Sequence, residues 1–298
     1  MRLSVVAPGI IAVLFIGTTP AQAIPHPIDP AQSIKSQFKG GHGVLISEVA
    51  TATYKGIKGT TKVATNGSIG FNASGAVNYD LTTGWTSSPQ LLELLGFDSS
   101  EDKSNSRTHA IKVGKYTYVS PFEWGERPEG RPWTRFGGKN NASWQDYGQR
   151  GSQLADVIHP KRLKFALSKA IQVRPGEYRG TLRTEDLYAE LGPMNPDRHT
   201  ISFRLFLNKA GLPIRLITEY KEKDSLPTME GKEVKTIRHE VVDTRYYRWG
   251  VKVKIAPPPA KEVVDWKDLP GPSFQNEQGC FLCGFQPRAL HDWPAKKI

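Results

Sequence analysis

The feature that most constrains the fold is a strand–turn–strand pattern at residues 199–220, HTISFRLFLNKAGLPIRLITEY. Apolar residues alternate with polar ones in the first arm, and the second arm keeps the phase: Ile201, Phe203, Leu205 and Leu207, then Leu212, Ile214, Leu216 and Tyr220. A period of two places these side chains on one face of a β-ribbon. Residues 208–211 (NKAG) supply the turn, because glycine tolerates positive φ. A lone hairpin buries too little to be stable, so further elements must cover this face.

Short strand patterns occupy most of the remaining chain. Strands are expected at residues 44–54, 60–65, 68–72, 76–81, 107–113, 116–119, 133–136, 178–182, 234–247 and 251–255. The Asn66-Gly67 dipeptide between two of them is typical of a tight hairpin turn. Such a series predicts an antiparallel meander.

Helical patterns are fewer and shorter. We expect helices at 31–39 and about 159–170 and a helical turn at 184–187. Residues 89–97 are expected to form a helical turn or a loop, and residues 261–269 a short helix or a turn. In the second helix Leu163, Leu167 and Ile171 recur at i, i+4 and i+8, which predicts an apolar stripe that packs on the sheet.

The first 23 residues have the pattern of a signal peptide. Arg2 precedes an apolar stretch at 5–16, and the stretch is followed by Ala-Gln-Ala at 21–23. We expect cleavage near Ala23 and export from the cytoplasm. The stretch is too short to span a bilayer, and no cysteine lies near the cleavage point to carry a lipid anchor. Residues 24–33 are expected to be a linker.

The chain is basic, with 40 Lys and Arg against 29 Asp and Glu and a formal net charge of +11. This balance favours attraction to an anionic membrane or cell-wall polymer, the alternative being a dispersed, solvated charge. No run of five basic residues occurs, and an exported protein meets little nucleic acid. We therefore exclude DNA and RNA as partners.

No catalytic, metal or cofactor motif is found. The sequence lacks a G-x-S-x-G elbow, an H-E-x-x-H motif and a Gly-rich phosphate loop. Ser152, in a Gly-containing loop, is only a weak nucleophile candidate, and no two histidines are spaced at i, i+3 or i, i+4. The acids that a glycosidase would pair are scattered along the chain: Asp80, Glu123, Asp186, Glu219 and Asp243. We expect no enzymatic activity, no metal and no cofactor.

Residues 270–298 are expected to form a tail that contains both cysteines, Cys280 and Cys283. In an exported chain this C-x-x-C pair favours a small disulfide. A redox-active pair lacks a βαβ context, and a zinc site that includes His291 lacks a second ligand pair. Four alternatives to the disulfide stay open: the redox-active pair, the zinc site, free thiols and a disulfide to another chain.

Several segments resemble the actinobacterial LppX/LprG-type cell-envelope lipoproteins. The resemblance is carried by DTRYYRWGVKVKIAPPPAKEVVDW (243–266), YRGTLRTEDLYAEL (178–191), LNKAGLPIRL in the hairpin, KYTYV (115–119), the WTRF strand (133–136) and the helix after His159-Pro160. It covers roughly Ile34 to Leu269. The chain departs from the family in lacking the lipobox cysteine and in adding the cysteine-bearing tail.

The resemblance implies an α+β fold of the LolA/LppX kind, a curved antiparallel half-barrel over residues 34–269 that wraps a few short helices. It also implies binding or transport of a lipid or acylated glycolipid in an apolar cavity. Candidate lining residues are the expected inward positions Phe71, Val77, Tyr79, Ile111, Phe203, Leu205 and Leu216, which would otherwise form a dry core. The alternative function is an envelope interaction or sensor module with a filled core.

Overall fold

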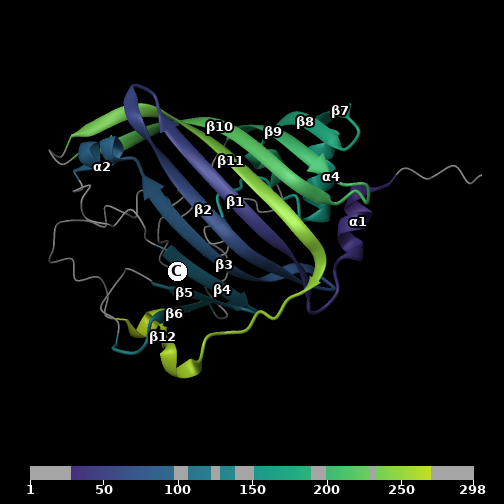
Figure 1. Ribbon diagram of the computed structural model, residues 1–298, viewed down its shortest axis with the longest axis horizontal. Coiled ribbons are helices and arrows are strands. Elements are labelled where there is room, and N and C mark those ends of the chain that lie inside the picture. Colours follow the sequence, from purple (N-terminus) through teal and green to yellow (C-terminus); the bar gives the residue numbers. More distant parts are fainter. Residues whose placement is uncertain are drawn as a thin grey trace, which may run out of the picture.

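The computed structural model describes residues 28–96, 107–121, 128–137, 151–188, 199–228 and 232–269. Twelve strands of this part form one sheet (Figure 1). The strands are β1 (His42–Tyr54), β2 (Ile57–Asn72), β3 (Gly75–Ser87), β4 (Arg107–Val113), β5 (Tyr116–Ser120), β6 (Trp133–Gly137), β7 (Ala170–Arg174), β8 (Glu177–Arg183), β9 (Thr200–Leu207), β10 (Pro213–Pro227), β11 (Glu233–Lys252) and β12 (Val263–Asp265). The α-helices are α1 (Pro30–Ser36), α2 (Pro89–Leu95), α4 (Pro160–Ser168) and α5 (Thr184–Leu187), and the 3-10 turns are η3 (Ala260–Glu262) and η4 (Trp266–Asp268).

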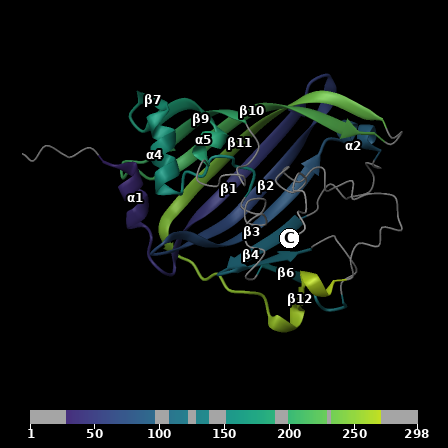
Figure 2. The same ribbon diagram turned by 180° about the vertical axis from the view of Figure 1, so that it is seen from behind.

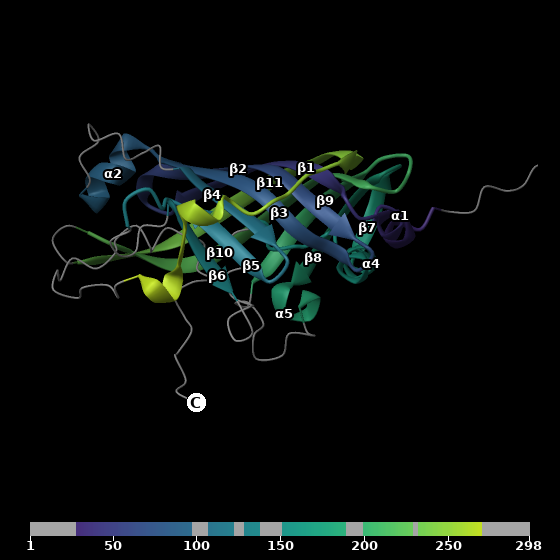
Figure 3. The same ribbon diagram turned by 90° about the horizontal axis from the view of Figure 1, so that it is seen from below.

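The strands lie in the order β12-β6-β5-β4-β3-β2-β1-β11-β10-β9-β8-β7. Every neighbouring pair is antiparallel except β12 and β6. The sheet is curved, and α4 and α5 lie on its inner side (Figures 2 and 3). This arrangement confirms the expected α+β class with a curved antiparallel sheet around short helices.

The hairpin at 199–220 is confirmed as β9 and β10, with Gly211 at φ +75° in the turn. One residue departs from the predicted face. Ile214 is 42% exposed, whereas Leu212 and Leu216 are buried. The register of the two strands shifts between Pro213 and Arg215, so a bulge turns Ile214 to the outer side.

The hairpin turn predicted at Asn66-Gly67 is wrong. Both residues lie inside β2, which runs unbroken between β1 and β3. Gly67 has φ +151°, and a Cβ placed on it would lie 2.0 Å from the carbonyl oxygen of Asp80. The absence of a side chain at Gly67 therefore allows β2 and β3 to approach closely, and the residue forms no turn.

Two further boundaries differ from the expectation. The second helix ends at Ser168, and Ile171 lies on β7 with 72% of its surface exposed instead of extending the helix stripe. The last two predicted strands form one strand, β11, in which Arg248 and Gly250 take positive φ near its end. The expected first helix is confirmed: Asp29 caps it by accepting a hydrogen bond from the amide of Ala31 at 2.8 Å.

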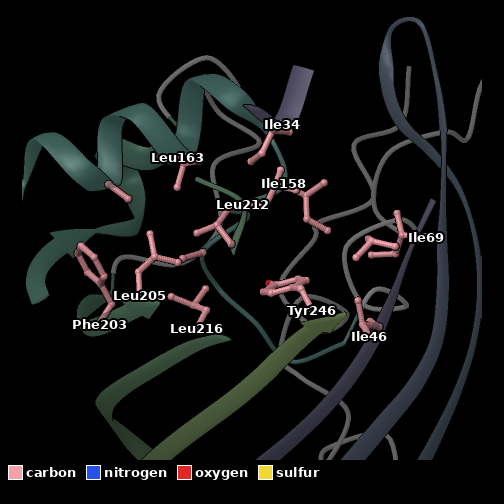
Figure 4. Packing of buried hydrophobic residues seen from close by; sticks show 14 of the residues in the cluster. Ile34, Ile46, Ile69, Ile158, Leu163, Phe203, Leu205, Leu212, Leu216 and Tyr246 are labelled. Atoms are coloured by element: carbon pink, nitrogen blue, oxygen red, sulfur yellow. The ribbon is translucent and has the colours of Figure 1, made fainter. Parts of the chain in front are cut away.

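A single large cluster forms the core on the inner side of the sheet (Figure 4). Leu205 and Leu216 come from neighbouring strands, and Ile34 of α1 and Leu163 of α4 belong to the same cluster. All four side chains are fully buried. A second, smaller cluster joins Leu91 and Leu95 of α2 to Tyr54 at the end of β1.

A short strand covers the edge of the sheet at β6. Val263 to Asp265 pair in parallel with Trp133 to Arg135. The guanidinium of Arg135 donates to Oδ2 of Asp265 at 3.0 and 3.2 Å, and the rings of Phe136 and Trp266 stack 6.5 Å apart. The sequence pattern indicated only a helix or turn here, because three residues are too few to show a period.

Candidate binding face

Five of the seven candidate lining residues belong to the main cluster on the inner face. These residues are Phe71, Tyr79, Phe203, Leu205 and Leu216, and each is at most 3% exposed. They come from β2, β3, β9 and β10, so both halves of the sheet contribute to one apolar surface. Whether they line a ligand cavity stays a prediction.

The other two candidates lie elsewhere. Ile111 pairs with Asp80 and Tyr118, and it therefore faces the outer side of the sheet, opposite to Tyr79. Val77 is half-buried at the bulge where the register between β2 and β3 shifts. The alternation of apolar and polar residues could not place either side chain. It shows which residues of one strand share a face, but not which of the two faces of the sheet that is.

A buried carboxylate interrupts the apolar inner face of β1. Glu48 lies between Ile46 and Ala50 on that face and is 1% exposed. Its Oε1 accepts a hydrogen bond from the amide of Ser152 at 2.5 Å, and its Oε2 accepts one from the hydroxyl of Thr244 at 2.7 Å. Burial raises the pKa of Glu48 to about 7, although both hydrogen bonds oppose the rise.

Glu48 anchors residues 151–158, which we call the inner segment. Its apolar residues Ala155, Val157 and Ile158 belong to the main core cluster. Gln153 in this segment donates to Thr244 at 2.9 Å and accepts from Thr218 at 2.6 Å. The inner segment is thus held on the concave face by one polar network and by apolar packing. Ser152, which from the sequence is a weak nucleophile candidate, takes part in this network through its backbone amide.

A second buried polar group lies further along the same face of β10 and β11. Arg238 donates to Glu240 and, at 3.2 Å, to Glu222. The ring of His199 lies 4.9 Å from the ring of Tyr220 and 3.8 Å from Glu222. Burial raises the pKa of Glu240, against the opposing effect of Arg238. Along β10 this polar group lies between Leu216 of the main apolar cluster and Leu226 of the smaller one. The inner face therefore places a polar patch between two apolar regions, which suits an amphipathic ligand.

The carboxylates weighed for glycosidase chemistry each contact a histidine or an arginine where the structure describes them. Asp80 contacts His109 at 2.6 Å, and Glu219 contacts His239 at 2.8 Å. Asp186 and Asp243 bind Arg183 and Arg215, respectively. Glu123 lies outside the described residues.

The predicted signal peptide, Cys280 and Cys283 also lie outside the described residues. In the part that the structure describes, no group of three or more His, Cys, Asp or Glu is placed to hold a metal ion. No helix within the same ranges is long and apolar enough to cross a membrane.

Comparisons with known proteins find similarity among solved structures and not at the level of sequence. No family model matches the chain, and no curated protein matches its sequence. Among solved structures, the chain is similar to the lipoprotein LppX of Mycobacterium tuberculosis, with 10% sequence identity and a TM-score of 0.34. That alignment covers 76% of this chain and 96% of LppX. A superposition at this score does not establish a shared fold, so the architecture rests on the strand pairing described above.

Proposed function

We propose that the protein is a non-catalytic binding protein that holds or carries a lipid or an acylated glycolipid on the concave face of its sheet. The observation that carries the proposal is the makeup of this face. Its apolar surface is covered by α1, α4 and the inner segment, none of which is a strand of the sheet. A cover held by side-chain contacts can move aside for an acyl chain without breaking a strand ladder.

The energetics of such a site are adequate without any catalytic group. Each buried methylene contributes about 0.8 kcal/mol, so a chain of roughly a dozen contributes about 10 kcal/mol before association costs. The polar patch of the same face, around Glu240 and Arg238, offers hydrogen-bonding groups to a headgroup. Export through the signal peptide at residues 1–23 and a Cys280–Cys283 disulfide belong to the same proposal.

A second candidate function is an envelope interaction or sensor module without cargo. It is favoured by one observation: Leu205 and Leu216 are 0% exposed, as expected for a packed core. The two functions differ in whether the inner face ever accepts a ligand.

Native mass spectrometry of the mature chain, purified from its own host, separates the two functions. We expect an added mass that solvent extraction identifies as a lipid. A bare protein mass that is unchanged after incubation with host lipid extract would favour the interaction module.

A matched pair of variants tests where the lipid lies. Ala50 faces inward on β1 and is 3% exposed, while its neighbour Thr51 faces outward. Ala50→Leu or, more severely, Ala50→Trp should lower the fraction of protein carrying lipid, and Thr51→Trp should not. Thermal melts establish that each variant is folded. A folded Ala50→Trp protein with undiminished lipid would exclude the inner face as the binding site.

A further inference from the structure

Arginines are concentrated on the outer face of the sheet between β8 and β11. Arg179 of β8 lies directly opposite Arg204 of β9, and Arg215 of β10 lies directly opposite Arg245 of β11. Like charges in directly opposed positions destabilise a sheet unless counter-charges compensate them. Arg174 of β7 lies beside the first pair, opposite Glu177.

Two carboxylates compensate these five arginines in part. Glu177, whose side chain is 2% exposed, accepts hydrogen bonds from Arg174 at 2.5 Å, from Arg179 at 2.9 and 3.0 Å and from Arg204 at 3.3 Å. The Arg179 hydrogen bond is the main reason that the pKa of Glu177 is lowered.

The second carboxylate, Asp243, has both oxygens hydrogen-bonded to the same arginine. It accepts two hydrogen bonds from Arg215, at 2.7 and 2.8 Å. Five positive and two negative charges leave a local charge of +3. Glu219, on the adjacent outward row, binds His239 rather than an arginine of this group.

Apolar side chains accompany the arginines. The ring of Phe206 has the guanidinium groups of Arg204 and Arg215 at 5.5 and 5.8 Å from its centre. On the neighbouring edge strand β7, Ile171 is 72% exposed and Val173 is 47% exposed. Exposed aliphatic residues beside arginines that outnumber their carboxylate partners are typical of surfaces that lie at a lipid–water boundary.

We propose that this surface docks the protein on a bilayer of anionic phospholipids. We call it the arginine face: Arg174, Arg179, Arg204, Arg215 and Arg245 with Ile171, Val173 and Phe206. Guanidinium groups bind phosphate diesters through paired N–H donors, and the +3 charge is complementary to an anionic leaflet. A soluble polyanion would satisfy the arginines but leave Ile171 and Val173 in water, whereas a bilayer takes up both.

This inference deepens the proposed function by naming the surface through which a carrier would meet the membrane. Vesicle binding is measured without reference to cargo, so its failure is distinguishable from a failure of the lipid-binding proposal. The curved sheet separates the two surfaces, since the arginine face lies on the side opposite to the core cluster.

The test is flotation of the mature full chain with vesicles of phosphatidylcholine alone or with about a third phosphatidylglycerol. The variant Arg174→Gln/Arg204→Gln/Arg245→Gln removes three charges but keeps the Arg179–Glu177 and Arg215–Asp243 pairs. Its partitioning onto anionic vesicles should fall on the order of a hundredfold, because each of the three basic residues near such a surface contributes about a factor of five. The matched control Lys58→Gln/Lys115→Gln/Lys261→Gln removes the same charge from exposed sites elsewhere and should retain binding within about twofold.

A second variant distinguishes a bilayer from a soluble polyanion. Ile171→Ser/Val173→Ser leaves the charge unchanged and should weaken vesicle binding severalfold without affecting binding to inorganic polyphosphate. Equal losses in the two charge variants would overturn the proposal. Full vesicle binding by the serine variant, together with competition by polyphosphate, would assign the arginine face to a soluble polyanion instead.

Discussion

The backbone amide of Ser152 donates a hydrogen bond of 2.5 Å to Oε1 of Glu48, joining positions 104 residues apart. This contact is the polar centre of the concave face. It fixes the inner segment on β1, and the hydroxyl of Thr244 fixes the same carboxylate on β11. A carboxylate in this position makes the stability of the protein depend on pH.

The substitution Glu48→Gln should remove a pH-dependent part of the folding stability. The pKa of Glu48 is raised from 4.5 to about 7 by burial, so the folded state holds a proton that the unfolded state releases. Its contribution is therefore complete below about pH 4.5 and is lost as the pH rises to about 7, a change on the order of 3 kcal/mol. Urea unfolding at pH 5 and pH 8 measures it.

In those unfolding experiments, the wild-type protein should lose stability between the two pH values, and Glu48→Gln should lose less. The variant should be the more stable protein at pH 8. Glu219→Gln, in which the replaced side chain is 51% exposed, serves as the control and should behave like the wild type. Parallel pH profiles for all three proteins would refute the assignment to Glu48.

The substitution Gly151→Ala should destabilise the inner segment. Gly151 has φ +107°, and a Cβ there would lie 2.5 Å from Oε1 of Glu48. Gly114→Ala is the matched control, since Gly114 has φ +59° with no atom within 4 Å of the added carbon. The control should cost about 1 kcal/mol from the backbone alone, and Gly151→Ala about 2 to 4 kcal/mol. Equal unfolding free energies for the two variants would show that the contact with Glu48 is unimportant.

Truncating Leu216 should reveal how tightly the core is packed. The side chain is 0% exposed, so Leu216→Ala should lower the unfolding free energy by about 2 to 5 kcal/mol. The control Ile171→Ala, at a position 72% exposed, should change it by less than about 0.5 kcal/mol. A small loss for Leu216→Ala would indicate that the inner face already contains unfilled space. Chemical denaturation of lipid-free protein gives both values.

Removing β12 should expose the edge of β6 and promote association between chains. A chain ending at residue 259 lacks Val264, which is 4% exposed, and Asp265, which binds Arg135. Unpaired edge strands readily pair with one another. Light scattering after size exclusion should detect larger species for this truncation. A chain ending at residue 269 keeps β12 and should elute like the full chain; identical profiles for both truncations would contradict the role given to β12.

The alternation of apolar residues was sufficient to predict most strands, because each strand buries one face. The hairpin at 199–220 and the N-cap of α1 at Asp29 are examples in which local chemistry and tertiary packing agree. The alternation gave wrong predictions at places where the contact with a neighbouring strand decides the local geometry. The bulge at Ile214 and the close approach at Gly67 depend on the neighbouring strand, which a single segment of sequence does not specify.

The polar centre of the candidate site could not be predicted from the sequence. Glu48 occupies an inward position of a strand, but the spacing alone does not distinguish a buried acid from one at an edge. Its partners, Ser152 and Thr244, lie about a hundred and two hundred residues away. The arginine face was equally hidden, since Arg179, Arg204 and Arg245 are adjacent only through strand pairing.

The pairing of β1 with β11 has a consequence for how the chain reaches its native state. Twelve residues of β1, from His42 to Tyr54, find their partners between Arg238 and Lys252. The middle of the sheet therefore cannot close until nearly the whole chain is present. Until then β1 presents an open hydrogen-bonding edge along its full length. Long-range closure of this kind slows folding to milliseconds or longer and lengthens exposure to aggregation, so a nascent chain would benefit from a chaperone that shields β1.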